Sequence, residues 1–199
     1  MRPVDHDAPH YLHQPPVPGE EHFLSLALVN TRYALSHGQV DLLEDTDAAR
    51  LWLVRHELLP DSTVLTGRQA SRLRGLREAL RELFAARAEG AVPSPRALDA
   101  VNAVLAAAPP TPRLVWAGRE PHRADEPDLA NPVGAALCAL AEDGADLLTG
   151  AEAERIAPCG ARGCTRWFLR SHAARRWCTT QCGNRVRAAR HYASRKSSA

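Results

Sequence analysis

The sequence predicts a mainly α protein in which a helical N-terminal domain precedes a small cysteine-rich module with a short hairpin and a basic C-terminal helix. Two observations support this prediction. Apolar residues recur every three to four positions, between recognisable helix caps, through residues 21–153. From Arg155 onward the composition changes abruptly, because the rest of the chain holds eleven basic residues and no Asp or Glu. The predicted domains are therefore residues 21–153 and 154–196, with residues 197–199 as a tail.

Residues 1–20 are rich in Pro and His and lack an apolar core, so we expect a disordered leader and no signal peptide. The longest strongly apolar run, Val133 to Ala141, is too short to span a bilayer. We therefore expect a cytoplasmic, nucleoid-associated protein with no membrane partner. In a reducing compartment, clustered cysteines favour metal binding over disulfide bonds.

Five helices are expected in the N-terminal domain. The clearest lies between Thr66 and Gly90, because Thr66 and Gln69 have capping-box spacing and glycine commonly ends a helix. The others run from Glu21 to Gly38, from the cap Asp45 or Thr46 to Pro60, from the cap Ser94 to Pro109, and from the cap Asn131 to Gly150. The segment "RLVWAG" is a strand candidate, and "GREPHRADEPDLANP" is predicted to be a polar loop.

Four of the five cysteines form two close pairs in the basic module. Cys159 and Cys164 enclose four residues, thirteen residues follow, and Cys178 and Cys182 enclose three. This layout is typical of a four-thiolate site for one structural Zn²⁺, which leaves no open coordination position for catalysis. Redox disulfides, an iron–sulfur cluster and unrelated thiols are the alternatives that the spacing leaves open. Cys138 lies on or beside the apolar stripe of the fifth helix and is expected to be a core residue.

The segments around the cysteine pairs predict how the module folds. Gly160 and Gly163 allow a tight turn around a metal. The segments "TRWFLRS" and "ARRW" are candidates for the two strands of a short hairpin, and "CTTQC" is typical of a helix start capped by Thr179 or Thr180. A loop that carries the first cysteine pair, a hairpin and a helix that carries the second pair together predict a treble-clef-like fold. About forty residues bury too little surface to fold unaided, so we expect metal binding to stabilise the module.

The stretch "RRWCTTQCGNRVRAARHY" resembles the CGNR zinc-finger family, named for a Cys-Gly-Asn-Arg tetrad that here spans Cys182 to Arg185. Members of that family pair the finger with an N-terminal helical domain called ABATE. The stretch "ALVNTR", Ala27 to Arg32, is similar to the Asn-Thr signature of that domain, and "LWL", Leu51 to Leu53, is similar to its tryptophan-containing helix. The resemblance implies a stress-induced transcription regulator. It also makes Asn30 and Thr31 candidate ligand-binding residues, although hydrogen bonding inside a helix also explains them.

The basic C-terminal segment is a candidate nucleic-acid interface, because arginine suits both phosphates and base edges. Its candidate residues are Arg175, Arg176, Asn184, Arg185, Arg187 and Arg190. Two of them have a second interpretation, since Asn184 can bond the finger backbone and Arg185 can hydrogen-bond a thiolate. Val186, Ala189 and Ala193 recur at helical spacing and are expected to pack onto the finger, which would turn arginines outward.

The predicted function is a DNA-binding transcription regulator, with the helical domain as a ligand-sensing unit, a dimerisation unit or both. An RNA- or ribosome-associated zinc protein and a protein-interaction adaptor are the alternatives. A small-molecule effector and a second copy of the chain stay open as further partners. The sequence contains no hydrolase, phosphate-loop, metalloprotease or dinucleotide motif, so we expect no catalytic residues and no enzymatic activity.

Overall fold

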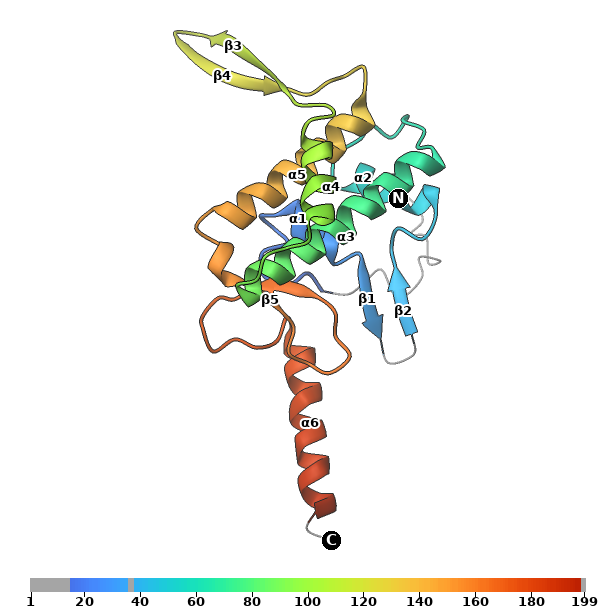
Figure 1. Ribbon diagram of the computed structural model, residues 1–199, viewed down its shortest axis with the longest axis vertical. Helices are drawn as coiled ribbons and strands as arrows, with labels where there is room; N and C mark the ends of the chain where they lie inside the picture. The colour runs from blue at the N-terminus through green and yellow to red at the C-terminus, as the bar shows by residue number, and fades with distance from the viewer. Residues whose placement is uncertain (1–14, 36–37, 198–199) are drawn as a thin grey trace, which may run out of the picture.

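The computed structural model describes residues 15–35 and 38–197. Figure 1 shows a helical body in the middle, with one helix extending from its lower end and a two-stranded arm from its upper end. The elements are α1 (Leu24–Val29), β1 (Arg32–Leu35), β2 (Gly38–Asp41), α2 (Thr46–Arg55), α3 (Gly67–Glu89), α4 (Pro95–Leu105), β3 (Thr111–Ala117), β4 (Glu120–Glu126), α5 (Pro132–Thr149), η2 (Ala153–Arg155), β5 (Ile156–Pro158), β6 (Trp167–Leu169) and α6 (Thr180–Ser197). The predicted mainly α class is confirmed. In the described part of the chain, no helix has both the length and the apolar character that a membrane span requires.

Helix α3 lies at the centre of the helical body and packs against α1, α2, α4 and α5. Its inner face is apolar, and Leu80 and Phe84 on it are completely buried. The Thr66 side chain accepts a hydrogen bond from the Gln69 N–H, and the Gln69 side chain accepts one from the Thr66 N–H. Gly90 ends the helix in the left-handed region, with φ of 65°. The expected limits of this helix are confirmed.

Local caps also fix the starts of α2, α4 and α5 as predicted. The side chains of Asp45, Ser94 and Asn131 each accept a hydrogen bond from the N–H three residues further on. Helices α2 and α4 end earlier than expected, ahead of the prolines that follow them. Cys138 is buried in α5, as predicted, and its thiol lies 3.6 Å from the Leu105 carbonyl oxygen.

The expected first helix, Glu21 to Gly38, is wrong over most of its length. Helix α1 is short and is followed by the antiparallel hairpin β1–β2. Contacts with distant residues fix the start of α1 and the end of the hairpin. Asp143 of α5 accepts hydrogen bonds from the first two N–H groups of α1, at 3.2 and 2.7 Å. At the end of β2, the Asp41 carboxylate accepts two hydrogen bonds, of 2.5 and 2.8 Å, from the buried Arg77 of α3.

Between α4 and α5, the strand candidate pairs with the segment expected to be a loop. Strand β3 confirms the first prediction, and β4 shows that the second is wrong. The register places Leu114 opposite Arg123 and Trp116 opposite Pro121. We call residues 111–126 the arm. The arm extends away from the helical body (Figure 1), and both of its strands are largely exposed.

Strands β5 and β6 form a short antiparallel sheet on either side of the first cysteine pair. The expected pairing of "TRWFLRS" with "ARRW" is therefore wrong, because the first segment supplies β6 and the apolar β5 is its partner. Successive side chains of β6 point to opposite faces. Trp167 and Leu169 pack into the core of the helical body, while Phe168 lies in the small core of the cysteine module.

Residues 15–20 form a strap between the helical body and the cysteine module. The leader expected over residues 1–20 is wrong for this part, and residues 1–14 lie outside the described chain. Val17 is 1% exposed and packs in the same small core as Phe168. The Pro18 carbonyl accepts a hydrogen bond from the Leu169 N–H at 2.8 Å. Gly19 has φ of 101°, and a Cβ there would lie 2.6 Å from the Leu169 side chain, so this position requires glycine.

Val17→Ala should lower the free energy of unfolding by about 2 kcal/mol, because it leaves a cavity in a core that has few other apolar side chains. Urea denaturation of the zinc-loaded chain measures this change. Val64→Ala is the matched control, since Val64 is 82% exposed and its truncation should change stability by less than about 0.5 kcal/mol. Equal stabilities of the two variants would contradict a packed strap.

Candidate metal centre and nucleic-acid interface

The four cysteines of the module bring their sulfur atoms together at the base of α6. All four sulfurs lie within 4.8 Å of one another. The Sγ–Sγ distances are 3.8 Å between Cys164 and Cys178 and 3.7 Å between Cys178 and Cys182. Zinc–sulfur bonds of about 2.3 Å in a tetrahedron give edges of about 3.8 Å. The cluster therefore fits one structural zinc ion, and its sulfurs are too far apart for the ~2.05 Å bond of a disulfide.

Backbone hydrogen bonds hold the two cysteine pairs in place. The Cys159 N–H donates to the Arg166 carbonyl at 2.9 Å, which closes the loop around the first pair. Gly163 has φ of 76°, the turn conformation that the sequence predicts for this loop. The Cys178 N–H points at the Cys159 sulfur, 3.4 Å away, and so joins the two pairs. The Thr179 hydroxyl accepts from the Cys182 N–H at 3.3 Å and caps α6, as predicted.

The thiols of Cys159, Cys164 and Cys178 shift one another's pKa. Hydrogen bonds from Cys164 and Cys178 hold the pKa of Cys159 at about 2. The hydrogen bond to Cys159 raises the pKa of Cys164 to about 11, and the pKa of Cys178 is raised for the same reason. A zinc ion binds thiolates and displaces the remaining protons. Zinc binding at this site therefore releases protons and weakens as the pH falls.

Two of the candidate nucleic-acid residues contact the metal centre. The Arg185 guanidinium lies 3.8 Å from the Cys182 sulfur. Four thiolates around Zn²⁺ carry a net charge of −2, which Arg185 offsets. Arg175 donates to the carbonyls of Trp177 and Cys178, at 3.2 and 3.0 Å. Its guanidinium also lies over the Phe168 ring, 5.7 Å from the centroid. Both arginines therefore support the finger itself.

The other four candidates have exposed side chains. Arg187 donates a hydrogen bond to the Asn184 side chain, so these two lie together on the outer surface of α6. The Asn184 side-chain oxygen thus contacts a neighbouring arginine. Arg190 lies further along the same helix, and Arg176 lies in the loop before Cys178.

Helix α6 leaves the finger after its first turns. Val186 is half-buried and packs on the small core, as expected, but Ala189 and Ala193 are exposed. The expectation that all three pack onto the finger is therefore wrong for the last two. The finger core is too small to cover more of the helix, and Figure 1 shows α6 extending beyond the body.

A buried polar network joins the finger to the helical body. The Asn30 amide donates to the Trp167 carbonyl and accepts from the Trp167 N–H, both at 2.8 Å. Asn30 also donates to Glu20 at 2.7 Å, and Glu20 forms an ion pair with Arg166 at 3.4 Å. We call these four residues the domain joint. Thr31 beside it donates to the Leu28 carbonyl at 2.7 Å and accepts from Arg77 at 3.1 Å.

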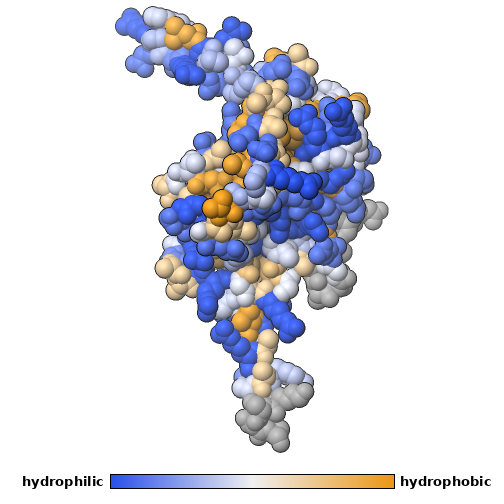
Figure 2. All heavy atoms as spheres, in the orientation of Figure 1, coloured by the Kyte–Doolittle hydropathy of each residue, from blue (hydrophilic) through white to orange (hydrophobic). Residues whose placement is uncertain are grey.

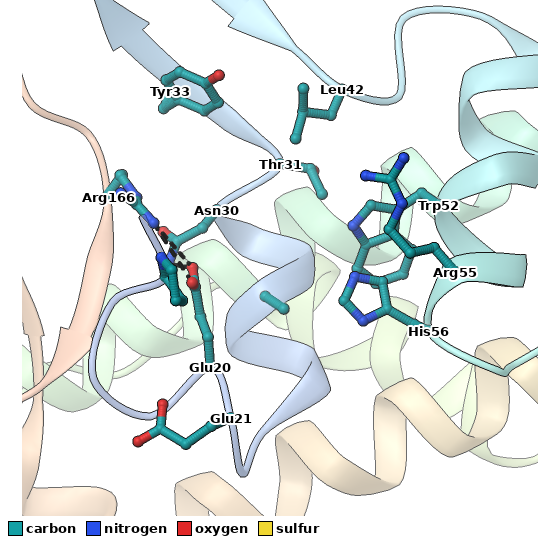
Figure 3. Close-up of a pocket in the computed structure, with 12 residues that line it drawn as sticks. Glu20, Glu21, Asn30, Thr31, Tyr33, Leu42, Trp52, Arg55, His56 and Arg166 are labelled. Atoms are coloured by element: carbon teal, nitrogen blue, oxygen red, sulfur yellow. Dashed lines mark hydrogen bonds and ion pairs between the residues drawn. The ribbon is translucent and has the colours of Figure 1, made fainter. Parts of the chain in front are cut away.

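A cavity of about 260 Å³ lies beside the domain joint. Figure 3 shows side chains from the helical body and Arg166 of the finger around it. Its walls comprise Pro16, Glu20, Glu21, Ala27, Asn30, Thr31, Tyr33, Leu42, Trp52, Arg55, His56 and Arg166. The His56 ring contacts Trp52 in a tilted arrangement, with centroids 4.3 Å apart and an interplanar angle of 43°. Burial, followed by the charge of Arg55, lowers the pKa of His56. Arg166 Nε is buried without a hydrogen-bond partner among the described atoms.

Sequence reasoning found Asn30 and Thr31 but missed the other residues around them. Glu20 and Arg166 are 146 positions apart, so no local pattern pairs them. The chemistry of Asn30 also differs from the expected one, because its amide groups are already bonded within the protein. The cavity walls still include both predicted residues.

The fold and the four-cysteine site define a protein with a helical domain joined to a C-terminal zinc finger. Residues 23–151 match the ABATE family, described as "Putative stress-induced transcription regulator", and residues 155–195 match the CGNR zinc finger. The chain therefore belongs to the ABATE family and carries a CGNR zinc finger. The resemblance found in the sequence is confirmed. A comparison with curated proteins gave no match.

Cys178→Ser should abolish stoichiometric zinc binding, because three thiolates and one hydroxyl do not form the four-thiolate site. Metal analysis of the purified chain measures this, with one zinc per chain expected in the unchanged protein. Cys138→Ser is the matched control and should keep its zinc, since Cys138 is not in the cluster. A zinc-free unchanged protein with a folded finger would contradict the assignment.

Proposed function

We propose that this protein is a DNA-binding transcription regulator whose helix α6 contacts DNA. The observation that supports this most is the isolation of α6. The helix extends away from the body (Figure 1), and the chain from Arg155 to its end contains no acidic residue. An α-helix of this kind fits the major groove of DNA, where phosphates line both sides.

The arginines of α6 are spread around the helix axis. Arg185, Arg187, Arg190 and Arg195 are separated by two, three and five residues. Each residue advances the helix by about 100°, so these spacings place the side chains on different sides. One side thus meets the finger through Arg185, and the others offer exposed cations to a surrounding groove. The proposed main contacts with DNA are Arg187 and Arg190. A hydrogen bond to the Asn184 side chain orients Arg187.

Binding to duplex DNA should weaken steeply with salt. Roughly four phosphate contacts give a log–log slope of about −3.6, and replacing Arg187 and Arg190 by Ala should make the slope less negative by about 2. Fluorescence anisotropy with a labelled duplex at several salt concentrations measures both slopes. Arg68→Ala is the control, because Arg68 is exposed on α3 in the helical body. An unchanged slope in the double variant would rule out α6 as the DNA contact.

The alternatives make different predictions in the same assay. An RNA- or ribosome-associated protein would prefer structured RNA when RNA competes with the labelled duplex. An adaptor that grips an acidic protein would leave the duplex unbound even at low salt. Preference for particular duplex sequences supports the regulator.

We also propose that the cavity beside the domain joint is the site of a small-molecule effector. Its walls come from both the helical body and the finger, since Trp52 and His56 belong to the first and Arg166 to the second. Arg166 lines the cavity, and its buried Nε has no hydrogen-bond partner among the described atoms. A molecule bound there would touch the residues that hold the finger, and so can influence the orientation of α6.

Ala27→Leu should block this site, because Ala27 lines the cavity and the larger side chain fills it. The test is native mass spectrometry of the full chain after incubation with a cellular metabolite extract. The unchanged protein should retain a small molecule that Ala27→Leu does not retain. Ala88→Leu is the matched control on an exposed turn of α3 and should retain it. Retention by Ala27→Leu, or by none of the proteins, would overturn the effector site.

A further inference from the structure

The arm exposes large apolar side chains although it lies far from the metal centre and the cavity. Leu114 is 75% exposed and Trp116 is 68% exposed. They are two residues apart on β3, so they share one face of the hairpin. On β4, Pro121 pairs with Trp116 and extends this apolar face. Figure 2 shows hydrophobic residues on the arm among hydrophilic neighbours. An exposed apolar face on a projecting hairpin is a candidate interaction site.

The arm also lacks the packing that a hairpin needs. An isolated two-stranded hairpin is marginally stable in water, and it normally gains stability from a third strand or from packing on a helix. In the described chain, β3 and β4 pack mainly against each other (Figure 1). Only Val115 and Ala124 are half-buried. A partner that covers the apolar face would supply the missing contacts.

The charges of the arm indicate which partner fits. Arg113, Arg119 and Arg123 balance Glu120, Asp125 and Glu126, so the arm has no excess of cations for nucleic acid. On the apolar face, Arg123 and Asp125 lie side by side, 3.8 Å apart. A face that carries both signs beside an apolar centre is complementary to itself. Under a two-fold axis, Arg123 of one copy can face Asp125 of the other.

We propose that the arm is the interface of a homodimer, in which the apolar faces of two arms pack together. Trp116 and Leu114 form the centre of this interface, and Arg123 and Asp125 form its polar rim. The arm and α6 lie at opposite ends of the molecule (Figure 1), so a dimer joined by its arms leaves both copies of α6 accessible. The proposal concerns self-association and does not depend on DNA binding.

Sedimentation of the full zinc-loaded chain over a concentration series tests the dimer. The unchanged protein should be a dimer, and Trp116→Ser should raise its dissociation constant about 30-fold or more, as expected for loss of a central aromatic side chain. Circular dichroism should show the same helix content. Val92→Asp is the control, because Val92 is 94% exposed outside the arm, and it should stay dimeric. A monomeric unchanged protein, or a Trp116→Ser variant that dimerises as tightly, would overturn the proposal.

A charge-exchange experiment tests whether the partner that packs on the arm is a second copy of the chain. Arg123→Asp and Asp125→Arg each place like charges opposite each other in a two-fold dimer, so each variant alone should associate at least about tenfold more weakly. Mixing the two variants restores opposite charges at both contacts. The mixture should form heterodimers as tight as the original dimer, detectable by native mass spectrometry. If mixing does not restore association, the proposed pairing of the two arms is wrong.

Discussion

Four cysteine sulfurs held within 4.8 Å of one another fix the C-terminal part of this protein. A zinc ion bound by all four connects the end of β5, the loop before β6 and the first turn of α6. The apolar core beneath it is small, and one of its members, Val17, comes from the strap near the other end of the sequence. Metal coordination and the strap therefore do together what a larger hydrophobic core does in an ordinary domain. Because the metal holds the first turn of α6, it also sets the direction in which the basic helix leaves the body.

Features that depend on neighbouring residues could be predicted from the sequence. The caps Asp45, Ser94 and Asn131 bond an N–H three positions away, and the structure has each of them. Features that depend on distant residues could not. Helix α1 begins where Asp143 of α5 caps it, and apolar periodicity alone extended the predicted helix through β1 to Gly38. Strand β4 has little apolar alternation, so only its pairing with β3 reveals it.

In the candidate site too, local sequence predicted some features, and contacts between distant residues determined the others. Cysteine spacing predicted the metal cluster, because short loops bring each pair together whatever the rest of the chain does. Arginine content did not distinguish Arg175 and Arg185, which contact the finger, from the arginines that make no such contact, because only the three-dimensional structure shows which guanidinium lies beside a carbonyl or a thiol. Asn30 was found through its motif, but its hydrogen bonds to Trp167 lie 137 positions away. The Asn30 side-chain amide bonds the N–H and the carbonyl of Trp167, as a neighbouring strand would. These buried backbone groups would lower the stability of the fold if they had no hydrogen-bond partner.

The domain joint matters because α6 acts as a lever. A helix of 18 residues is about 27 Å long, so a rotation of about 10° at its base moves its tip by roughly 5 Å. If α6 binds DNA as proposed, such a displacement exceeds the tolerance of side-chain contacts with base edges, which require hydrogen-bond distances near 3 Å. A finger on a loose linker would lose this precision. The buried pair of Glu20 and Arg166, the Asn30 amide and the strap instead hold β6 against the helical body. Arg166 belongs to both the joint and the cavity wall, so the proposed effector would bind beside the contacts that orient α6.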